Sequence, residues 1–324
     1  MHSTTEGRLH VVAAVVSDTK GRILLAKRPA DLHQGGLWEF PGGKREPGEE
    51  VTRTLMRELR EELGITAGQF RPLIGIEYDY PDRKVFLDVW RVSAFSGEAR
   101  GLEGQEIRWV EPGTLKTFAF PAANRPIISA ALLPASYLIT PEPGEPGQWR
   151  SFLERLDASL GGDIRLVQLR AKGLAPEEHA ALAPHVLERC HSKGCKVLLN
   201  GEPELALTLG YDGVHLGSGR LADTGARPLP EDSLVAASCH NLAELSMASA
   251  LGCDFAVLGP VCTTASHPGT PAMGWESFQQ LVSRCDIPVY ALGGMSRSDY
   301  TQAWQHGAQG IAAIRALWQG RENE

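Results

Sequence analysis

The stretch from Gly42 to Ile65, GGKREPGEEVTRTLMRELREELGI, is the feature that most restricts how this chain folds. Its glycines and proline are typical of a loop, and the residues after them have the periodicity of a helix. Apolar side chains recur every fourth residue, which predicts one face for docking on another layer. These positions are Val51, Leu55, Leu59 and Leu63.

The same helix places Glu58, Glu61 and Glu62 within an arc of about 100°, since each residue turns the helix by about 100°. Like charges this close repel each other. A divalent cation relieves the repulsion, and carboxylate oxygens suit Mg²⁺ or Mn²⁺. A solvated acidic face paired with arginines is the alternative for such a helix considered alone.

Loop and helix together resemble the Nudix box, which defines the residues Gly43, Glu49, Arg57, Glu58, Leu59, Glu61, Glu62, Gly64 and Ile65. The resemblance implies an α+β fold with a mixed sheet between helices, and hydrolysis of a nucleoside diphosphate linked to another group. It implies a catalytic metal site made by Glu58, Glu61 and Glu62, with the Gly43 carbonyl and Glu49 nearby and Arg57 orienting a glutamate. Such cations neutralise phosphate charge and lower the pKa of an attacking water.

Segments 27–44, 78–90 and 120–128 resemble MutT-type 8-oxo-dGTP diphosphatases, a likeness that covers most of residues 8–130. This implies Mg²⁺-dependent conversion of a nucleoside triphosphate, 8-oxo-dGTP, to 8-oxo-dGMP and pyrophosphate, which keeps an oxidised nucleotide out of DNA. Arg28 matches an arginine that contacts the substrate phosphate. Asn124 matches an asparagine that reads the oxidised purine, for which an amide that donates and accepts is suited. A helix N-cap is the alternative for Asn124.

One position departs from that family. The family's representative enzyme carries a further glutamate just before a tryptophan, and here the residue is Arg108, in EIRWV. Glu103, Glu106 or a glutamate of the helix itself are the alternatives for the general base.

The chain is expected to form two domains, residues 1–132 and 133–324. In the first, strands are predicted in segments 8–28, 70–80, 84–95 and 106–112, with a closing helix in 124–133. In the second, short apolar runs alternate with amphipathic stretches, as buried parallel strands alternate with helices. The runs are 136–140, 165–170, 196–200, 213–216, 234–239, 255–260, 288–294 and 310–314. This pattern predicts an α/β (β/α)₈ TIM barrel, with a doubly wound sheet as the alternative.

The second half resembles the thiamin phosphate synthase/TenI family over about residues 135–318, through VQLRAK (167–172), LLNGEPELALTLGYDGVHLG (198–217), ASCHN (237–241), LGPVCTTASHPG (258–269), ALGGM (291–295) and GAQGIAAI (307–314). It implies a site for a thiazole or thiamin phosphate whose phosphate-binding residues are Arg170, Lys172, Thr264, Ser266, Gly293 and Gly294. His240 matches an acid/base histidine of TenI-type thiazole tautomerases. A strand-end histidine with local hydrogen bonds is the alternative.

This half also departs from its family. Gly201 and Arg220 stand where the synthase has metal-binding aspartates, and His267 replaces a lysine. Without the acids, Mg²⁺-assisted departure of pyrophosphate loses its ligands. Three hypotheses remain: a nucleotide hydrolase carrying a ligand-binding barrel, a thiamin-biosynthesis enzyme (synthase or tautomerase) whose Nudix half acts on a related pyrophosphate, and a barrel that is only a sensor or scaffold.

Composition limits the partners. The net charge of −7 argues against direct nucleic-acid binding, which requires a basic face, and is compatible with a small anionic substrate. The six cysteines form no paired CxxC units, which fits reduced thiols. No apolar run reaches the ~18 residues of a membrane helix and no signal core precedes residue 10, so we expect a cytoplasmic protein. The sequence makes no prediction of the oligomeric state.

Overall fold

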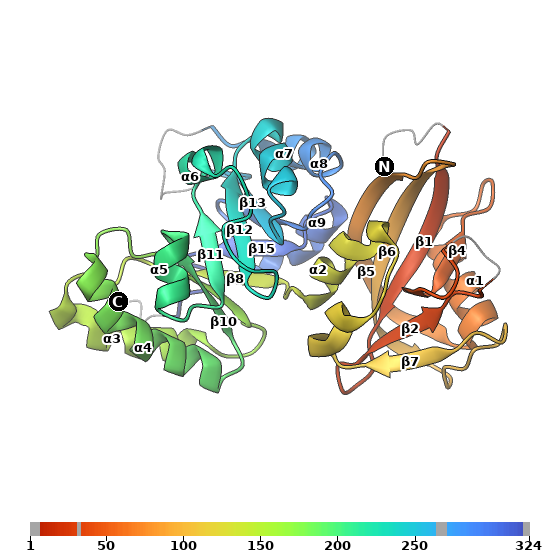
Figure 1. The fold of residues 1–324 in the computed structure, drawn as a ribbon, viewed down its shortest axis with the longest axis horizontal. Coiled ribbons are helices and arrows are strands. Elements are labelled where there is room, and N and C mark those ends of the chain that lie inside the picture. Colours follow the sequence, from red (N-terminus) through yellow and green to blue (C-terminus); the bar gives the residue numbers. More distant parts are fainter. Residues whose placement is uncertain (1–6, 31–33, 264–270, 320–324) are drawn as a thin grey trace. The chain divides into compact units, whose positions relative to one another are not determined.

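The computed structural model describes residues 7–30, 34–263 and 271–319. The chain divides into two compact units, Met1–Leu132 and Leu133–Glu324 (Figure 1). Each unit has apolar core clusters of its own.

The first unit is built on a mixed sheet of four strands in the order β4-β1-β6-β5. Strand β1 runs parallel to β6 and antiparallel to β4, while β5 and β6 form a long antiparallel hairpin. A second sheet, β3-β2-β7, is antiparallel. The elements are β1 (Leu9–Val16), β2 (Ile23–Lys27), β3 (Trp38–Glu39), β4 (Gly42–Lys44), α1 (Val51–Leu63), β5 (Thr66–Asp79), β6 (Lys84–Ser96), β7 (Ile107–Val110), the 3₁₀ helices η1 (Pro112–Thr117) and η2 (Ala122–Asn124), and α2 (Arg125–Leu132).

The two α-helices cover the mixed sheet from opposite sides, as α1 and α2 do in Figure 1. Successive side chains of β1 point to opposite faces. Val12 and Ala14 therefore belong to the core beneath α1, and Ala13 and Val15 to the core beneath α2. The predicted mixed sheet between helices is confirmed.

Helix α1 ends at a glycine C-cap. Gly64 has a left-handed φ of 69°, and its N–H donates to the Arg60 carbonyl at 3.0 Å. The next N–H, of Ile65, donates to the Leu59 carbonyl at 3.3 Å. The leucines of the predicted apolar face are fully buried. Their docking fixes the rotation of α1 about its axis and so determines which glutamates lie over β4.

The second unit is a closed barrel of eight parallel strands in the order β10-β11-β12-β13-β14-β15-β8-β9. The predicted (β/α)₈ barrel is confirmed, and the doubly wound alternative is wrong. The strands are β8 (Ser136–Ile139), β9 (Leu166–Leu169), β10 (Lys196–Asn200), β11 (Gly213–Leu216), β12 (Leu234–Cys239), β13 (Phe255–Leu258), β14 (Val289–Leu292) and β15 (Gly310–Ala313). The helices are η3 (Pro146–Gln148), α3 (Trp149–Ser159), α4 (Pro176–Ser192), α5 (Pro203–Thr208), α6 (Ser218–Asp223), α7 (Leu242–Ala250), α8 (Gly274–Val282), η4 (Arg297–Asp299) and α9 (Tyr300–Gln305).

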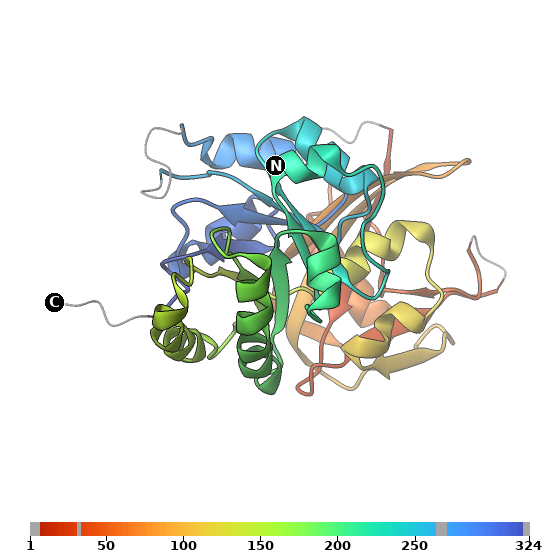
Figure 2. The ribbon, with the colours of Figure 1, turned by 60° about the vertical axis from the view of Figure 1, so that its left-hand side comes forward.

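Both faces of each barrel strand are buried, which explains why the strands read as continuous apolar runs. Tyr137 and Ile139 of β8 belong to the cluster that fills the interior, whereas Leu138 packs in the outer cluster with the helices. The helices lie outside the ring of strands (Figure 2). Among the described residues, the loops after the strands carry Arg170, Lys172, His240, Gly293 and Gly294, as in other barrels of this kind.

Within the described ranges, none of the helices combines the length and the apolar character that crossing a membrane requires.

Candidate functional site

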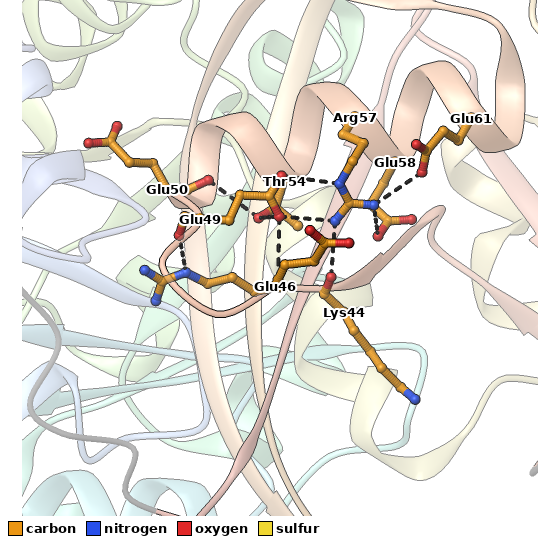
Figure 3. A network of polar contacts seen from close by, with 9 residues as sticks. Lys44, Glu46, Glu49, Glu50, Thr54, Arg57, Glu58 and Glu61 are labelled. Carbon is orange, nitrogen blue, oxygen red and sulfur yellow. Dashed lines mark hydrogen bonds and ion pairs between the residues drawn. The ribbon is translucent and has the colours of Figure 1, made fainter.

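The guanidinium of Arg57 is the centre of a polar network on α1 (Figure 3). Its Nε and Nη2 donate to the two oxygens of Glu49 at 3.1 and 3.0 Å. Its Nη1 donates to Glu58 at 2.8 Å and to Glu61 at 3.1 Å, and Nη2 also donates to the Lys44 carbonyl at 3.2 Å. One cation of the protein thus holds three carboxylates together.

Glu49 is committed to this network. Hydrogen bonds from Arg57, and a hydrogen bond of 2.8 Å from the Thr54 hydroxyl, lower the pKa of Glu49 to about 2. The carboxylate is therefore ionised at neutral pH and fixes the guanidinium from the loop side. Both of its oxygens accept hydrogen bonds from Arg57, and one of them also accepts from Thr54.

The carboxylates of Glu58 and Glu62 lie over the two glycines of β4. The N–H of Gly42 donates to Glu62 Oε2 at 3.1 Å. A Cβ atom on Gly43 would lie 2.4 Å from the carboxylate carbon and oxygens of Glu58. Glycine is therefore required for the carboxylate to approach the backbone this closely. Glu61 lies further out, with 57% of its side chain exposed against 12% for Glu58.

Both carboxylates over β4 are poorly solvated. Burial raises the pKa of Glu62 to about 8, and the charges of Glu39, Glu58 and Glu103 raise it further while the Gly42 N–H opposes the shift. Burial also raises the pKa of Glu58, against its hydrogen bond from Arg57. Desolvated carboxyl groups that repel one another gain most from a bound cation.

Oxygen ligands of this kind fit a hard divalent cation such as Mg²⁺ or Mn²⁺. Of the predicted ligands, Glu58, Glu62 and the carbonyl of Gly43 would hold it at β4, while Glu49 and Glu61 are held beside them by Arg57. Among the described residues, no three His, Cys, Asp or Glu side chains are already gathered around a common point. Arg57 explains why Glu58 does not join such a group, because the guanidinium draws one oxygen of that carboxylate to itself.

The structure adds a carboxylate that the sequence did not single out. Glu39, in the two-residue strand β3, is half-buried and forms an ion pair with Arg28. Burial raises the pKa of Glu39 against the effect of Arg28, and its charge acts on Glu62. The predicted phosphate arginine is therefore tied to the edge of the carboxylate cluster. The available signal was an acid in WEFPGGK, directly before the glycine pair.

Asn124 is 9% exposed, and its side-chain amide makes no hydrogen bond to any residue within the described ranges. Its backbone N–H donates to the Pro121 carbonyl at 2.9 Å. In the described part of the chain, the hydrogen bond that a helix N-cap would make is thus missing, and the amide keeps its donors and acceptor for another partner.

Arg108, the residue that departs from the MutT pattern, forms an ion pair with Glu106. Arg108 lies 4.9 Å from the ring centre of Trp38 and donates to Glu106 at 2.6 Å. Glu106 also binds Lys27 at 3.3 Å, and its pKa is lowered chiefly by the hydrogen bond from Arg108. Glu103, in contrast, acts electrostatically on the two carboxylates over β4. The charge of Glu103 is therefore felt at these carboxylates, whereas that of Glu106 is engaged by Arg108 and Lys27.

In the barrel, Arg170 follows β9 and donates to Glu142 at 2.6 Å. Its backbone N–H donates to the hydroxyl of Thr140 at 3.0 Å, which joins the loops after β8 and β9. Lys172 is exposed, and its charge reaches the interior, where it helps to lower the pKa of His215.

A buried polar network crosses the barrel interior. The Tyr137 hydroxyl accepts from Gln168 Nε2 at 3.2 Å, and Gln168 Oε1 accepts from Asn200 at 2.9 Å. The imidazole of His215 lies 3.2 Å from the Tyr137 hydroxyl and 2.8 Å from that of Ser238. Burial lowers the pKa of His215 to about 3, so the ring is neutral. In the sequence, this network is marked by single polar residues within apolar strands, Gln168 in β9 and His215 in β11.

His240 is exposed and locally bonded. Its Nδ1 lies 2.9 Å from Glu244 Oε2, which also accepts the backbone N–H of His240 at 2.7 Å. These contacts are what the alternative interpretation, a strand-end histidine with local hydrogen bonds, predicts.

Gly293 and Gly294 have φ values of 99° and 69°, and a Cβ on Gly294 would lie 2.8 Å from the Thr263 carbonyl. Backbone packing alone therefore requires the second glycine. The other predicted phosphate residues of this region, Thr264 and Ser266, lie outside the described residues, as does His267.

Comparison with known proteins agrees with this architecture. The model of the Nudix domain matches residues 11–130, and that of thiamine monophosphate synthase matches residues 136–317. The 8-oxo-dGTP diphosphatase of Escherichia coli is 38% identical over 38% of this chain and 95% of its own length. The CTP pyrophosphohydrolase of the same organism is 39% identical over 38% of this chain and 90% of its own. The thiamine-phosphate synthase of Thermus thermophilus is 33% identical over 56% of this chain and 86% of its own.

The fold and the carboxylate cluster define a hydrolase unit followed by an α/β barrel. The chain belongs to the Nudix family through its first unit and to the thiamine monophosphate synthase family through its second.

Gly43→Ala tests the close approach of Glu58 to β4. The new methyl group displaces the flexible carboxylate, so we expect the free energy of unfolding to change by about 1 kcal/mol or less. The affinity for Mn²⁺, followed by electron paramagnetic resonance, should fall about tenfold or more. Gly113→Ala is the matched control, because its Cβ meets open space. Unchanged Mn²⁺ affinity in Gly43→Ala would contradict the assignment.

The raised pKa of Glu62 predicts that the folding stability of the metal-free protein, measured in EDTA, depends on pH. Its folded pKa, about 8, exceeds the unfolded value near ~4.3, so folding favours the protonated form. This contribution to stability is complete below about pH 4.3 and is lost as the pH rises through about 8. In ¹³C-labelled protein, one glutamate carboxyl signal should titrate near pH 8. That signal should disappear in Glu62→Gln and shift to lower pH with Mg²⁺. A set of carboxyl signals that all titrate below about pH 5 would exclude the burial described for Glu62.

Proposed function

We propose that the first unit hydrolyses 8-oxo-dGTP to 8-oxo-dGMP and pyrophosphate with Mg²⁺, for which Mn²⁺ substitutes. The reaction would take place in the cytoplasm and remove an oxidised precursor before DNA synthesis uses it. The observation that carries this proposal is the pair of desolvated carboxylates, Glu58 and Glu62, over the glycines of β4 and beside Arg57.

In this proposal a bound Mg²⁺ neutralises phosphate charge and makes water more acidic. The remaining work belongs to the chain. Glu49 fixes Arg57, and Arg57 holds Glu58 and Glu61. Arg28 binds a substrate phosphate. Water attacks the β-phosphorus, its oxygen enters pyrophosphate, and the nucleoside monophosphate leaves with the bridging oxygen.

Glu103 is the proposed acceptor of the proton that the water loses. Its charge acts on both carboxylates over β4, whereas Glu106 is neutralised by Arg108 and Lys27. A base must lie within reach of the attacking water and remain ionised.

The choice of nucleotide rests on residues outside the helix. The relatives named for 8-oxo-dGTP and for CTP are almost equally similar to this chain, so likeness alone does not choose between them. Asn124 supports the oxidised purine, because its shielded amide has no partner among the described residues and can both donate and accept.

For the barrel we propose a ligand that carries a phosphate group on a thiazole or thiamin-type body, bound by Arg170 and Lys172. His240 is the proposed proton-transfer residue, with Glu244 holding its Nδ1 side. Synthase chemistry is not part of the proposal, since Gly201 and Arg220 replace the metal-binding acids that the resemblance implies.

A nucleotide assay tests the hydrolase. With Mg²⁺, the wild-type protein should release pyrophosphate from 8-oxo-dGTP with a higher kcat/KM than from dGTP or CTP, and should leave thiamin diphosphate intact. Glu58→Gln should lower the rate about a hundredfold or more. Glu98→Gln, whose exposed side chain pairs only with Arg100 among the described residues, is the matched control. Full activity of Glu58→Gln would refute the metal role, and a preference for CTP would refute the substrate.

The same assay tests Asn124. Asn124→Ala should lower kcat/KM for 8-oxo-dGTP by about tenfold, the effect of losing one or two hydrogen bonds. The value for CTP should change much less. Equal losses for both nucleotides would mean that the amide does not read the base.

A further inference from the structure

The mouth of the barrel carries an ion pair where the family resemblance implies metal-binding acids. Gly201, directly after β10, offers no side chain, and Arg220 lies in α6 after β11. The guanidinium of Arg220 donates through Nε to Glu202 Oε2 at 3.3 Å and through Nη2 to Oε1. Glu202, the acid next to Gly201, is therefore already neutralised by a fixed cation.

A divalent metal does not fit this arrangement. Mg²⁺ requires several oxygen ligands in near-octahedral positions. Here Gly201 offers no side-chain oxygen, Arg220 is itself a cation, and the carboxylate of Glu202 is engaged by Arg220. The guanidinium of Arg220 would also repel a second cation bound by Glu202.

The same mouth is rich in positive groups. Strand β10 pairs in parallel with β9 and with β11, so the loops after these strands lie at one edge of the barrel. Arg170 and Lys172 follow β9, and Arg220 follows β11. Glu142 and Glu202 neutralise the two arginines, which leaves the lysine charge in excess among these five groups.

We propose that the barrel mouth binds a phosphate monoester without a divalent cation, and that Arg220 supplies the charge a metal ion would otherwise supply. The inference rests on the barrel part of the proposed function. Ion pairs exposed to water are weak, and Glu202 is exposed. Guanidinium–phosphate contacts are charge-assisted and bidentate, so a phosphate displaces Glu202 from Arg220.

The presence of a guanidinium in place of a metal ion has a chemical consequence. A guanidinium neutralises a bound phosphate, but it does not act as a Lewis acid on a leaving pyrophosphate. The site is therefore suited to hold a phosphate ester intact. Arg170 shares the arrangement, because its carboxylate partner Glu142 is also exposed and belongs to the neighbouring loop.

Calorimetric titration of the full chain with thiamin monophosphate tests the inference. The titration is done in a Glu58→Gln background, which removes a proposed metal ligand from the nucleotide site, once with EDTA and once with Mg²⁺. We expect equal affinity in both buffers. Arg220→Gln should weaken binding about ten- to hundredfold, as for loss of a charged hydrogen-bond donor. Arg150→Gln, which breaks a similar pair with Glu154 on α3, should have no effect.

Two further variants keep the test decisive if Arg220→Gln folds poorly. Glu202→Gln releases Arg220 and should tighten binding in both buffers. The double variant Gly201→Asp/Arg220→Asp restores the acids and should make binding dependent on Mg²⁺. Binding that requires Mg²⁺ in the unaltered barrel, or that Glu202→Gln weakens, overturns the inference but leaves the phosphate ligand in place. Absence of binding in both buffers removes the proposed ligand and the inference with it.

Discussion

The first unit depends on how the negative charge of α1 is balanced. The leucine face docks on the sheet and leaves no freedom to turn the glutamates away from β4. Arg57 balances Glu49, Glu58 and Glu61 at once, whereas Glu62 accepts a backbone N–H and has a raised pKa. The crowding is therefore relieved in part by the protein itself, and the remaining part is the basis for proposing a metal.

Arginine–carboxylate ion pairs recur at the proposed phosphate sites of both units. Arg28 pairs with Glu39, Arg170 with Glu142, and Arg220 with Glu202. These carboxylates keep the arginines neutralised in the absence of ligand. In the two barrel pairs, whose carboxylates are exposed, a phosphate competes well for the arginine, because exposed ion pairs contribute little and guanidinium–phosphate contacts are strong.

Most of the fold could be predicted from the sequence, because its signals are periodic and local. The apolar residues at every fourth position predicted α1, and each of the eight apolar runs corresponds to a strand of the barrel. Residues on short or inward-facing positions escaped prediction. Glu39 lies in a two-residue strand without periodicity, and Gln168 and His215 meet across the barrel only through strand pairing. The Nudix box predicted which glutamates gather on α1, but not that Arg57 would hold three carboxylates.

Amide hydrogen exchange of α1 and β4, with and without Mg²⁺, tests the central claim most directly. This claim is that the carboxylates over Gly42 and Gly43 bind a divalent cation. At Mg²⁺ about a hundredfold above its Kd, protection of these elements should rise by up to about 2.7 kcal/mol. In a Glu58→Gln/Glu62→Gln variant it should not rise. Equal Mg²⁺-dependent protection in the wild type and the variant, or none in either, would contradict the account.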